Sequence, residues 1–391
     1  MQTRDAYNPS FAVVVLGAGP CGSAAAAGLA RRGLPTALVG RPAGERPNVG
    51  ECLPAGIQPQ LEKAGVWDEF LRAGHTSSAG IRSVWGSPEA FDRDFLMSPY
   101  SVGWHIDRAR FDEMMIRSAS RNGAEAVECS AIRNVVKTAS GWRIHLSTGS
   151  GERVLNGGVV IDATGRSSVF ARRLGVKRIL LDRLTGVAGY FTPRDGGPTI
   201  EPVLLLEAVE HGWWYTAPLP ENRMIAVFLT DASHVQAEAL TQPDCWLRSL
   251  HQTVHQRHRI EAHGGTLEAV IRILPAESSY LEQIAGDGWL AAGDAATAFD
   301  PLSSQGIISA ISAGLDAAGT AAAWLAGDTK APQAYAAVAR RKYAEYLAHR
   351  QIYYGIERRW PDSRFWNARR VPPEALAAPR SGTNERAAAT Q

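Results

Sequence analysis

Three glycines near the N-terminus have the spacing of a pyrophosphate-binding turn. Gly17, Gly19 and Gly22 form a G-x-G-x-x-G motif, with Pro20 and Cys21 inside it. In such a motif the first glycine makes the tight turn, the second lets the backbone approach the phosphates, and the third lets a helix pack closely on a strand. The helix N-terminus then directs its partial positive charge at the anion. The spacing therefore predicts that this turn binds a dinucleotide.

The flanking residues supply the strands and the helix that such a turn requires. Residues 11–16 are an apolar run, too short to span a membrane and typical of a buried parallel strand. Residues 23–32 are small and favour a helix, and residues 36–39 form a second apolar run, so the segment predicts a βαβ unit. The acidic residue that usually follows the second strand and binds the ribose is replaced by Gly40 and Arg41. Either water or backbone holds the ribose, or Arg41 contacts a phosphate or stacks on the adenine.

Two further glycine turns follow apolar runs later in the chain. One contains Asp162 and Gly165 in the sequence D-A-T-G-R-S, and the other contains Gly293 and Asp294 in G-D-A-A. The order of the three motifs resembles that of the FAD-dependent monooxygenases of the p-hydroxybenzoate hydroxylase type and of their relatives, the flavin-dependent halogenases and geranylgeranyl reductases. The resemblance covers most of residues 11–330 and implies that the cofactor is FAD.

This resemblance assigns cofactor roles to particular residues. It implies that Asp294 binds the ribityl-phosphate part of FAD and that Arg108 reaches the FAD phosphates; the alternative for Arg108 is an i,i+4 ion pair with Asp112. It also implies that a loop bounded by proline and glycine carries a helix N-terminus to the isoalloxazine ring, where N–H groups would stabilise the reduced, anionic flavin. The expected cofactor-binding set is Gly17, Gly19, Pro20, Cys21, Gly22, Arg41, Arg108, Asp162, Gly165, Gly293, Asp294, Pro301, Ser304, Gln305, Gly306 and Ile307.

Departures from the halogenase pattern indicate the subgroup. Tryptophan halogenases carry a W-x-W-x-I-P strand, which residues 213–218 resemble, although the second Trp and the Ile are replaced. The lysine with which those enzymes activate hypohalous acid falls at Arg82, and an arginine, which stays charged, cannot take that role. Pro218 is followed by Leu219 where geranylgeranyl reductases carry a lysine. The chain therefore resembles tryptophan-halogenase-like flavoproteins that hydroxylate.

The C-terminal aromatic run supports one such group. Residues 353–361, with Phe365 and Trp366, are similar to the corresponding run of the monooxygenases that mature tryptophylquinone cofactors, the alternative being an aromatic packing helix. The resemblance implies an FAD-dependent monooxygenase that hydroxylates an electron-rich aromatic ring, with a Trp side chain of a partner protein as the candidate substrate. Reduced FAD would react with oxygen while the protein orients the ring and excludes water. Because the chain has no second glycine fingerprint, either NAD(P)H reduces the FAD directly or a separate flavin reductase supplies the electrons.

Candidate acid–base and substrate residues follow from their places beside these motifs. Glu51 and His105 are the candidates for a general acid or base, and a hydrogen-bonded structural role is the competing interpretation for each. Substrate contacts are expected from the inserted sheet, because an aromatic substrate stacks well on aromatic walls. These candidates are Arg82, Trp213, Trp214 and Tyr215. Neighbouring residues of a strand point to opposite faces, so Trp213 and Trp214 cannot both line one pocket.

The pattern as a whole predicts an α/β protein with a Rossmann-like FAD-binding domain, an inserted antiparallel-sheet substrate domain and a C-terminal helical segment. A helix is expected over residues 57–73 and another over about 236–262, and Asp107 is expected to cap a third. The expected boundaries are 11–185 and 279–330 for the FAD-binding domain, 186–278 with a contribution from 75–105 for the substrate domain, and 331–380 for the helical segment.

Composition bounds the class of protein. The chain has 391 residues, 45% of them hydrophobic and 20% charged, and its formal charge of +2 gives no general attraction to nucleic acid. The four cysteines are scattered without a C-x-x-C pair, no signal-peptide pattern opens the chain, and no apolar run reaches ~18 residues, so a cytoplasmic protein without a membrane span is expected. His251, His255 and His258 favour a polar face over a metal site. The arginines of the C-terminal part form either a solvated face or a docking site for an acidic protein.

Two other functions compete with the monooxygenase. One is a flavin-dependent reductase or dehydrogenase of a small or isoprenoid substrate. The other is a dinucleotide-binding scaffold without catalysis, which the missing ribose acid favours and the intact Gly293–Asp294 and 301–306 segments oppose. Flavin content after purification separates the scaffold from the enzymes, and oxygen-dependent NAD(P)H consumption stimulated by an aromatic compound separates the two enzymes.

Overall fold

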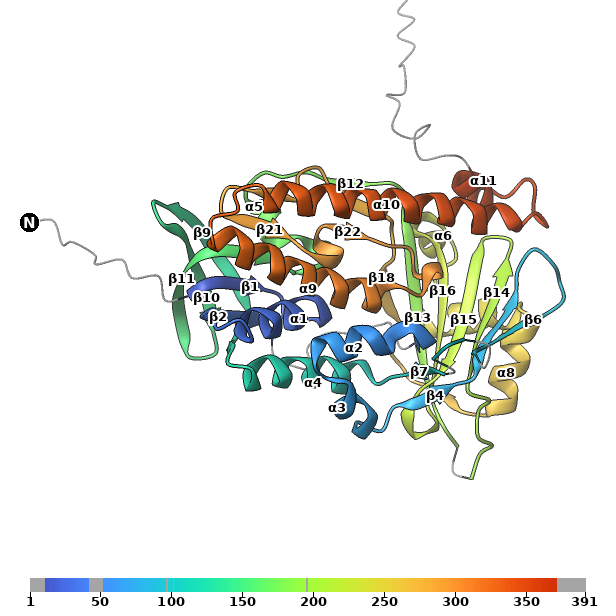
Figure 1. Cartoon of the computed structure of the whole chain (residues 1–391). Coiled ribbons are helices and arrows are strands. Elements are labelled where there is room, and N and C mark those ends of the chain that lie inside the picture. The colour runs from blue at the N-terminus through green and yellow to red at the C-terminus, as the bar shows by residue number, and fades with distance from the viewer. Residues whose placement is uncertain (1–10, 42–51, 96–97, 101, 195, 371–391) are drawn as a thin grey trace, which may run out of the picture.

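The computed structural model describes residues 11–41, 52–95, 98–100, 102–194 and 196–370. Two large sheets form its framework, one at each end of the molecule, and long helices connect them (Figure 1). The predicted class, α/β with an FAD-binding fold, is confirmed by this arrangement.

The first sheet grows from the N-terminal βαβ unit. β1 (Phe11–Leu16) lies between β2 (Thr36–Gly40) and β11 (Gly151–Asp162), parallel to both, and α1 (Pro20–Ala30) joins β1 to β2. Val13 and Val15 point into the core that contains α1, whereas Val14 and Leu16 point into the core on the other face. Both faces of β1 are therefore buried, which explains why its sequence is continuously apolar instead of alternating.

The remaining strands of this sheet come from the middle and late parts of the chain. The strand order is β20-β21-β11-β1-β2-β8, and β10 and β9 extend from β11 as antiparallel neighbours. Their bounds are β8 (Glu125–Glu128), β9 (Ala131–Thr138), β10 (Gly141–Thr148), β20 (Ala285–Gly286) and β21 (Trp289–Ala291).

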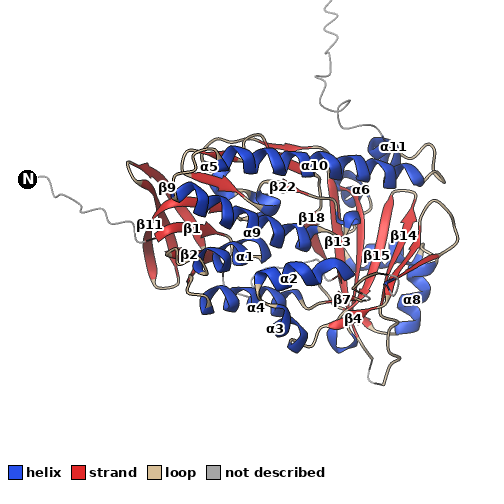
Figure 2. Cartoon of the chain, in the orientation of Figure 1, coloured by secondary structure: helices blue, strands red, loops and turns tan. Residues whose placement is uncertain are grey.

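Two long helices follow near the end of the chain, the first packed on α1 and the second packed on the first (Figure 2). They are α9 (Gly306–Leu325) and α10 (Ala331–Ile356). A Cβ atom on Gly314 of α9 would lie 2.1 Å from the carbonyl oxygen of Cys21, so this close approach of α9 to α1 requires glycine. Among the described residues, α9 is the one helix whose length and apolar composition would suit a membrane span. Its buried residues pack in the protein core, so it is a core helix of this fold.

The second sheet is mainly antiparallel, in the order β17-β13-β16-β15-β14-β5-β6, with β18 also paired to β13. Two helices, α7 (Pro243–His251) and α8 (His255–His263), pack with the face that carries Trp214 and Phe228. The strands are β5 (Gly80–Val84), β6 (Phe91–Asp94), β13 (Leu184–Thr192), β14 (Val203–Val209), β15 (Gly212–Pro218), β16 (Met224–Asp231), β17 (Thr266–Leu267) and β18 (Arg272–Pro275). Thus β5 and β6, from the 75–105 segment, extend the sheet built by residues 184–275.

Short elements connect these parts. β3 (Cys52–Leu53), β7 (Gly103–His105) and β4 (Thr76–Ser78) form one small sheet, and β12 (Arg178–Leu180), β19 (Ser279–Leu281) and β22 (Thr297–Ala298) form another. The other helices are α2 (Gln58–Ala64), α3 (Trp67–Arg72), α4 (Arg108–Arg121), α5 (Val169–Arg173), α6 (Ala232–Ala237) and α11 (Arg364–Arg370). Single 3₁₀ turns are η1 (Ala55–Ile57), η3 (Gly165–Ser167), η4 (Pro220–Asn222), η5 (Gly293–Ala295) and η6 (Pro301–Ser303).

Local predictions succeed where the signal is a cap and fail where a helix is interrupted. Asp107 caps α4, its side chain accepting a hydrogen bond from the Arg110 N–H, as predicted. The single helix predicted over 57–73 is wrong, because Gly65 adopts φ +74° and ends α2 before α3 begins. The single helix predicted over 236–262 is also wrong, since α6, α7 and α8 replace it.

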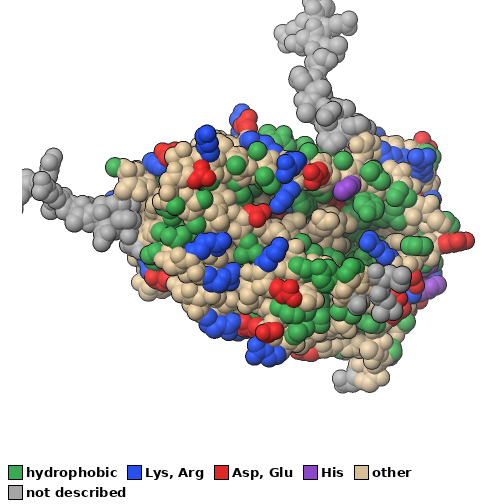
Figure 3. All heavy atoms as spheres, in the orientation of Figure 1, with side chains coloured by type: hydrophobic (Ala, Val, Ile, Leu, Met, Phe, Trp, Pro, Cys, Tyr) green, Lys and Arg blue, Asp and Glu red, His purple; other side chains and the backbone are tan. Residues whose placement is uncertain are grey.

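Charges are mixed on the surface, and several arginines are internal. On the face drawn in Figure 3, basic side chains are interspersed with acidic and apolar ones, so no patch of one sign covers that face. Three of the C-terminal arginines expected on a solvated face or docking site are instead largely buried in ion pairs. They are Arg350 with Asp182 and Asp300, Arg359 with Glu357, and Arg369 with Asp231.

Candidate active site

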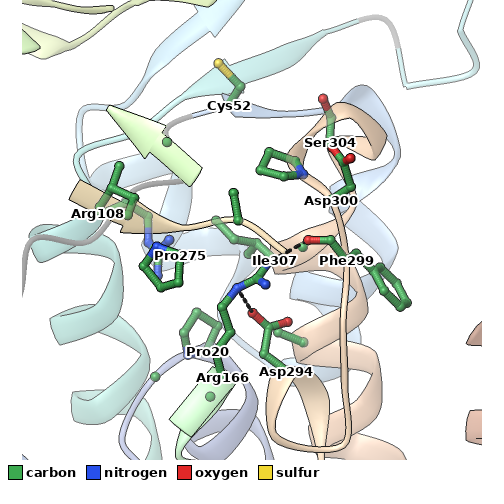
Figure 4. Close-up of a pocket in the computed structure, with 18 of the residues that line it drawn as sticks. Pro20, Cys52, Arg108, Arg166, Pro275, Asp294, Phe299, Asp300, Ser304 and Ile307 are labelled. Atoms are coloured by element: carbon green, nitrogen blue, oxygen red, sulfur yellow. Dashed lines mark hydrogen bonds and ion pairs between the residues drawn. The ribbon is translucent and has the colours of Figure 1, made fainter. Parts of the chain in front are cut away.

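A cavity of about 520 Å³ lies between the two large sheets. Backbone turns of the first sheet line one end, and side chains of the second sheet line the other. In Figure 4, Pro20, Arg166 and Asp294 lie at one end of this pocket, and Cys52 and Ser304 lie at the opposite end. The three glycine motifs, far apart in the sequence, therefore meet at one site.

The first motif forms the entry to α1. Gly19 is the N-cap residue, no side chain caps the helix, and a Cβ atom on Gly19 would meet nothing within 4 Å, so the helix N-terminus is open to the cavity. Gly17 and Gly22 are instead required by close contacts within the turn. Gly17 has φ +108° and its Cβ would lie 2.2 Å from the Ala163 carbonyl oxygen, whereas a Cβ on Gly22 would lie 1.8 Å from the Gly17 oxygen. These two glycines shape the turn, and Gly19, Pro20 and Cys21 line the cavity.

The end of β2 explains the missing acidic residue. A Cβ atom on Gly40 would lie 2.3 Å from the Cβ of Ala18, in the turn after β1. No side chain fits at this position without displacing the pyrophosphate-binding turn. Arg41 is exposed and is not among the described residues that line the cavity. Its proposed contact with phosphate or adenine stays a prediction.

Asp162 does not reach the cavity, contrary to its expected cofactor role. Its side chain is completely buried, and both oxygens are occupied by the protein. Oδ1 accepts hydrogen bonds from the Thr164 N–H (3.0 Å) and hydroxyl (2.6 Å), and Oδ2 accepts from the N–H groups of Phe170 and Ala171 (both 3.0 Å). Burial raises the pKa of this carboxyl, while the hydrogen bonds act in the opposite direction. Asp162 thus fixes the turn after β11 and the start of α5, and the following residues, including Gly165, line the cavity.

Arg166, inside the second motif, is a lining residue that sequence reasoning did not select. Its guanidinium donates to the carbonyl oxygens of Phe299 (2.6 Å) and Glu277, and Nε lies 3.7 Å from Asp294 Oδ2 (Figure 4). Its place in D-A-T-G-R-S was the available signal. Arg166 therefore brings a positive charge to the cavity end that the glycine turns form.

The third motif places Asp294 on the cavity wall. Gly293 has φ +59°, and a Cβ there would approach the side chain of Cys21 to 3.0 Å, so Gly293 shapes the turn without being a lining residue. Arg178 fixes this turn from behind by donating to the carbonyl oxygens of Asp294 (2.8 Å) and Ala295 (3.1 Å). The Asp294 side chain is 39% exposed, which leaves it accessible to a ligand.

The position of Arg108 is compatible with both interpretations of its sequence context. It lines the cavity, and its Nη2 also lies 3.3 Å from Asp112 Oδ1 in the i,i+4 ion pair. Both side chains are only 13% exposed. The ion pair holds the guanidinium in place at the cavity wall, so pairing and access to the cavity are compatible.

The loop before α9 lines the cavity with backbone and small side chains. Asp300 caps the 3₁₀ turn η6 by accepting from the Leu302 N–H at 2.9 Å, and Ser304 then adopts φ +50°. No side chain caps α9, so its first N–H groups remain available to an anion. Pro301, Ser304, Gly306 and Ile307 are lining residues, whereas Gln305 is exposed and is not one of them.

The second sheet provides an apolar and aromatic wall. Alternate residues of neighbouring strands point into the cavity, including Leu204 and Leu206 of β14, Trp213 and Tyr215 of β15, and Val227 and Leu229 of β16. Phe299 also lines the cavity, where its carbonyl oxygen accepts a hydrogen bond from Arg166, while its ring stacks on Tyr346 with 4.4 Å between the ring centroids. Trp214 points to the opposite face, where it stacks on Phe228 with 4.6 Å between the ring centroids. Strand alternation therefore separates the two tryptophans as expected, and Trp214 is a core residue without access to the cavity.

Arg82, a predicted substrate contact, also lies outside this cavity. Its guanidinium donates to Asp92 (2.7 Å) and Glu201 (2.8 Å). It lines a separate hollow of about 370 Å³ together with His255 and His258 of α8. The described residues contain no cluster of three or more side chains able to hold a metal ion.

Of the two acid–base candidates, Glu51 lies outside the described residues. His105 is fully buried in β7, and its Nδ1 lies 3.2 Å from the sulfur of Cys52, which does line the cavity. Burial, with the positive charge of Arg259, lowers the pKa of His105 to about 4, so the imidazole is neutral near pH 7. Cys52 thus lies between His105 and the cavity, and the catalytic role of His105 stays a prediction.

These residues fit FAD. The cavity begins at an uncapped helix N-terminus beside an open glycine, contains two arginines, and ends at a second uncapped helix N-terminus. Backbone N–H groups and arginines suit phosphates, and the aromatic wall beside the second helix suits planar rings. The fold and the cavity define a dinucleotide-binding flavoprotein of the FAD-dependent oxidoreductase class.

Comparison with known proteins gives the family. Residues 87–390 match the family described as tryptophan halogenase, and the chain belongs to this family. It is 26% identical over 363 residues to a protein of Marinomonas mediterranea described as an FAD-dependent oxidoreductase, LodB, covering 92% of this chain and 97% of that protein. It is also 26% identical to a tryptophan 2-halogenase of Chondromyces crocatus, covering 94% of this chain and 72% of the relative.

Solved structures have the same fold. The myxobacterial chondrochloren halogenase CndH superposes with a TM-score of 0.83 at 25% identity, covering 93% of this chain and 86% of that one. The peptidyl tryptophan dihydroxylase QhpG superposes with a TM-score of 0.76 at 23% identity, covering 92% and 78%. The chain is accordingly an FAD-dependent oxidoreductase with the halogenase fold.

Proposed function

We propose that this chain is an FAD-dependent monooxygenase that hydroxylates an electron-rich aromatic ring. The observation that carries the proposal is the chemistry of the cavity. Its substrate end is lined by Trp213, Tyr215 and aliphatic side chains, and none of its described lining residues is a lysine.

No lysine from any part of the sequence lines the cavity. The sequence contains five lysines, Lys63, Lys137, Lys177, Lys330 and Lys342, all within the described residues. Each of them is exposed, and none lines the cavity. A halogenase needs a lysine ammonium near the substrate to activate hypohalous acid, and Arg82, at the matching place in the sequence, is held outside by Asp92 and Glu201. These facts favour hydroxylation over halogenation on the halogenase scaffold.

Each part of the cavity has a task in the proposed reaction. FAD, when bound, supplies the oxygen-activating redox chemistry. The N–H groups at the start of α1 and the Arg108 guanidinium would hold its phosphates, and the N–H groups at the start of α9 would stabilise negative charge on it. Trp213 and Tyr215 hold the substrate ring, while the aliphatic residues around them exclude water.

We propose a Trp side chain of a partner protein, modified during tryptophylquinone maturation, as the substrate. A solved protein of the same fold is described as a peptidyl tryptophan dihydroxylase essential for tryptophylquinone biogenesis. An indole is an electron-rich ring that suits an aromatic wall and a cavity of about 520 Å³. The electrons come either directly from NAD(P)H or through a separate flavin reductase.

The test supplies purified holoprotein with a flavin reductase, NADH, oxygen and a Trp-containing peptide, with and without bromide. The expected product carries added oxygen, detected by mass spectrometry, and bromide leaves it unchanged. A brominated peptide would overturn the proposal, and so would flavin oxidation without any change of the peptide or of free indole compounds. Arg82→Lys is the matched control, which tests whether a lysine at this position of the sequence is enough for halogenation. Because position 82 lies outside the cavity, this variant is expected to give no halogenation.

A further inference from the structure

A buried hydrogen-bond network links the C-terminal helix α10 to the loop before α9. Asp300 is 1% exposed, and its Oδ1 caps the turn η6 by accepting a hydrogen bond from the Leu302 N–H at 2.9 Å. Its other oxygen, Oδ2, accepts from the Tyr354 hydroxyl at 2.8 Å and from Arg350 Nε at 3.3 Å. A helix cap needs only one oxygen. The second set of bonds ties the loop to a helix some fifty positions later in the chain.

The same hydroxyl also holds the substrate wall. Trp213, whose ring lines the cavity, donates its indole N–H to the Tyr354 oxygen at 3.1 Å. Tyr354 is fully buried, so it has no access to bulk water. One continuous chain of hydrogen bonds therefore runs from Trp213 through Tyr354 and Asp300 to the backbone of the turn at Leu302.

Charge and burial keep these hydrogen bonds in one arrangement. Arg350 lies between Asp182 (2.7 Å) and Asp300 (3.3 Å), and all three side chains are at most 12% exposed. Burial and the negative charge of Asp300 raise the pKa of Tyr354 well above its ordinary value, so its hydroxyl keeps its proton and donates to Asp300. The Arg350 guanidinium also lies 4.9 Å from the centre of the Tyr354 ring. The direction of each hydrogen bond is thus fixed.

We propose that Tyr354 is a positioning residue that couples the substrate wall at Trp213 to the flavin loop at residues 300–304. The inference rests on the proposed function, in which an aromatic substrate contacts Trp213. A ring that presses on Trp213 shifts its indole N–H, and the shift reaches the flavin loop through the Tyr354 hydroxyl. The loop then adjusts the flavin environment when the substrate is in place.

The test is a double-mutant cycle that needs no turnover. Tyr354→Phe removes the hydroxyl and keeps the ring, and Trp213→Phe removes the indole N–H and keeps an aromatic wall. FAD dissociation constants, the visible flavin spectrum and the flavin midpoint potential are measured for the wild type, both single variants and the double variant. Tyr343→Phe is the matched control, because Tyr343 is buried in the same helix and its hydroxyl has no hydrogen-bond partner among the described residues.

The expected results separate coupling from simple packing. Tyr354→Phe weakens FAD binding about tenfold, which corresponds to about 1.4 kcal/mol, and alters the flavin spectrum. Trp213→Phe alters both quantities in the wild-type background and has no further effect when Tyr354 is Phe. Tyr343→Phe behaves like the wild type.

Additive effects of the two substitutions would overturn the inference, because Trp213 would then act on the flavin without Tyr354. Wild-type FAD affinity and spectrum in Tyr354→Phe would overturn it as well. Should Tyr354→Phe fail to fold, Asp300→Asn takes its place in the cycle, because it replaces the charged acceptor of the Tyr354 hydroxyl; non-additive effects with Trp213→Phe support the coupling, and additive effects refute it. A chain that shows the coupling and hydroxylates no aromatic ring contradicts the proposed function alone, and one that hydroxylates without coupling contradicts this inference alone.

Discussion

Replacing Asp162 by asparagine separates a structural role of the second glycine motif from a cofactor-binding role. The carboxylate accepts four hydrogen bonds, two on each oxygen, from Thr164, Phe170 and Ala171. Asparagine keeps one acceptor oxygen and turns an NH₂ group toward the donors on the other side. Two hydrogen bonds to a charged group, each contributing ~1.5–3 kcal/mol, are lost. Asp162→Asn is therefore expected to lower the free energy of unfolding by about 3–6 kcal/mol, a large share of the stability of a typical protein.

The assay is thermal unfolding of the apoprotein, followed by FAD titration of the folded variant at low temperature. The expected fall in Tm is roughly 5 °C or more. Asp287→Asn is the matched control, because the Asp287 side chain is 89% exposed and its ion pair with Lys137 contributes no more than ~1 kcal/mol. An Asp162→Asn apoprotein as stable as the control, combined with a tenfold or larger loss of FAD affinity, would refute the structural assignment.

Four further substitutions test other parts of the structure. Gly40→Asp, which restores the usual acidic residue, is expected to weaken FAD binding, since its Cβ would lie 2.3 Å from that of Ala18; an FAD titration that gave tighter binding would contradict this steric argument. Trp213→Ala is expected to raise KM for an aromatic substrate, whereas Trp214→Ala, on the opposite face, is expected to cost ~3–5 kcal/mol of stability, measured by denaturant unfolding. Burial lowers the pKa of His105 to about 4 in the folded state, so between pH ~6.5 and 4 only the unfolded state binds a proton at this residue. The free energy of unfolding therefore falls as the pH falls through this window. His105→Gln is expected to flatten that fall by up to ~1.4 kcal/mol per pH unit.

The sequence was most informative where a motif and its surroundings are contiguous. The turn at Gly17–Gly22 could be predicted because its strand, glycines and helix lie within thirty residues, and each contributes an independent local signal. The same contiguity placed the Asp107 cap correctly. At Gly40 the sequence revealed a departure from the fingerprint, but only the three-dimensional contact with Ala18 gives its physical cause.

Side-chain direction and long-range pairing could not be predicted in the same way. The motif at Asp162 marked a corner of the cavity, yet it did not reveal that the aspartate turns inward to α5 while Arg166 turns towards the site. Alternation along β15 required that Trp213 and Trp214 separate, without saying which of them faces the cavity. The pairing of Asp300 with Tyr354 joins two segments that have no common sequence pattern.

The distribution of charge within the cavity connects the fold to the choice of reaction. Its two described arginines, Arg108 and Arg166, lie beside Asp112 and Asp294, at the part of the cavity that fits the phosphates and ribityl chain of FAD. The wall that carries Trp213 is uncharged, because the lining residues of β13 to β16 and β18 are apolar or aromatic apart from the Tyr215 hydroxyl. Halide chemistry needs a cationic group that holds an oxidised halogen next to the substrate ring, and a lone ammonium in this apolar region would carry a large desolvation cost. Transfer of a hydroxyl group to an electron-rich ring would need the protein to hold the ring in place and to exclude water, the tasks for which apolar and aromatic side chains are suited. The separation of charge from aromatic surface within one cavity therefore favours the hydroxylase on a halogenase scaffold.

A lysine introduced at Leu206 or Val227, inside the aromatic end, is expected to test that separation. A variant that folds, binds FAD and then halogenates free indole would show that the missing ammonium alone divides the two reactions.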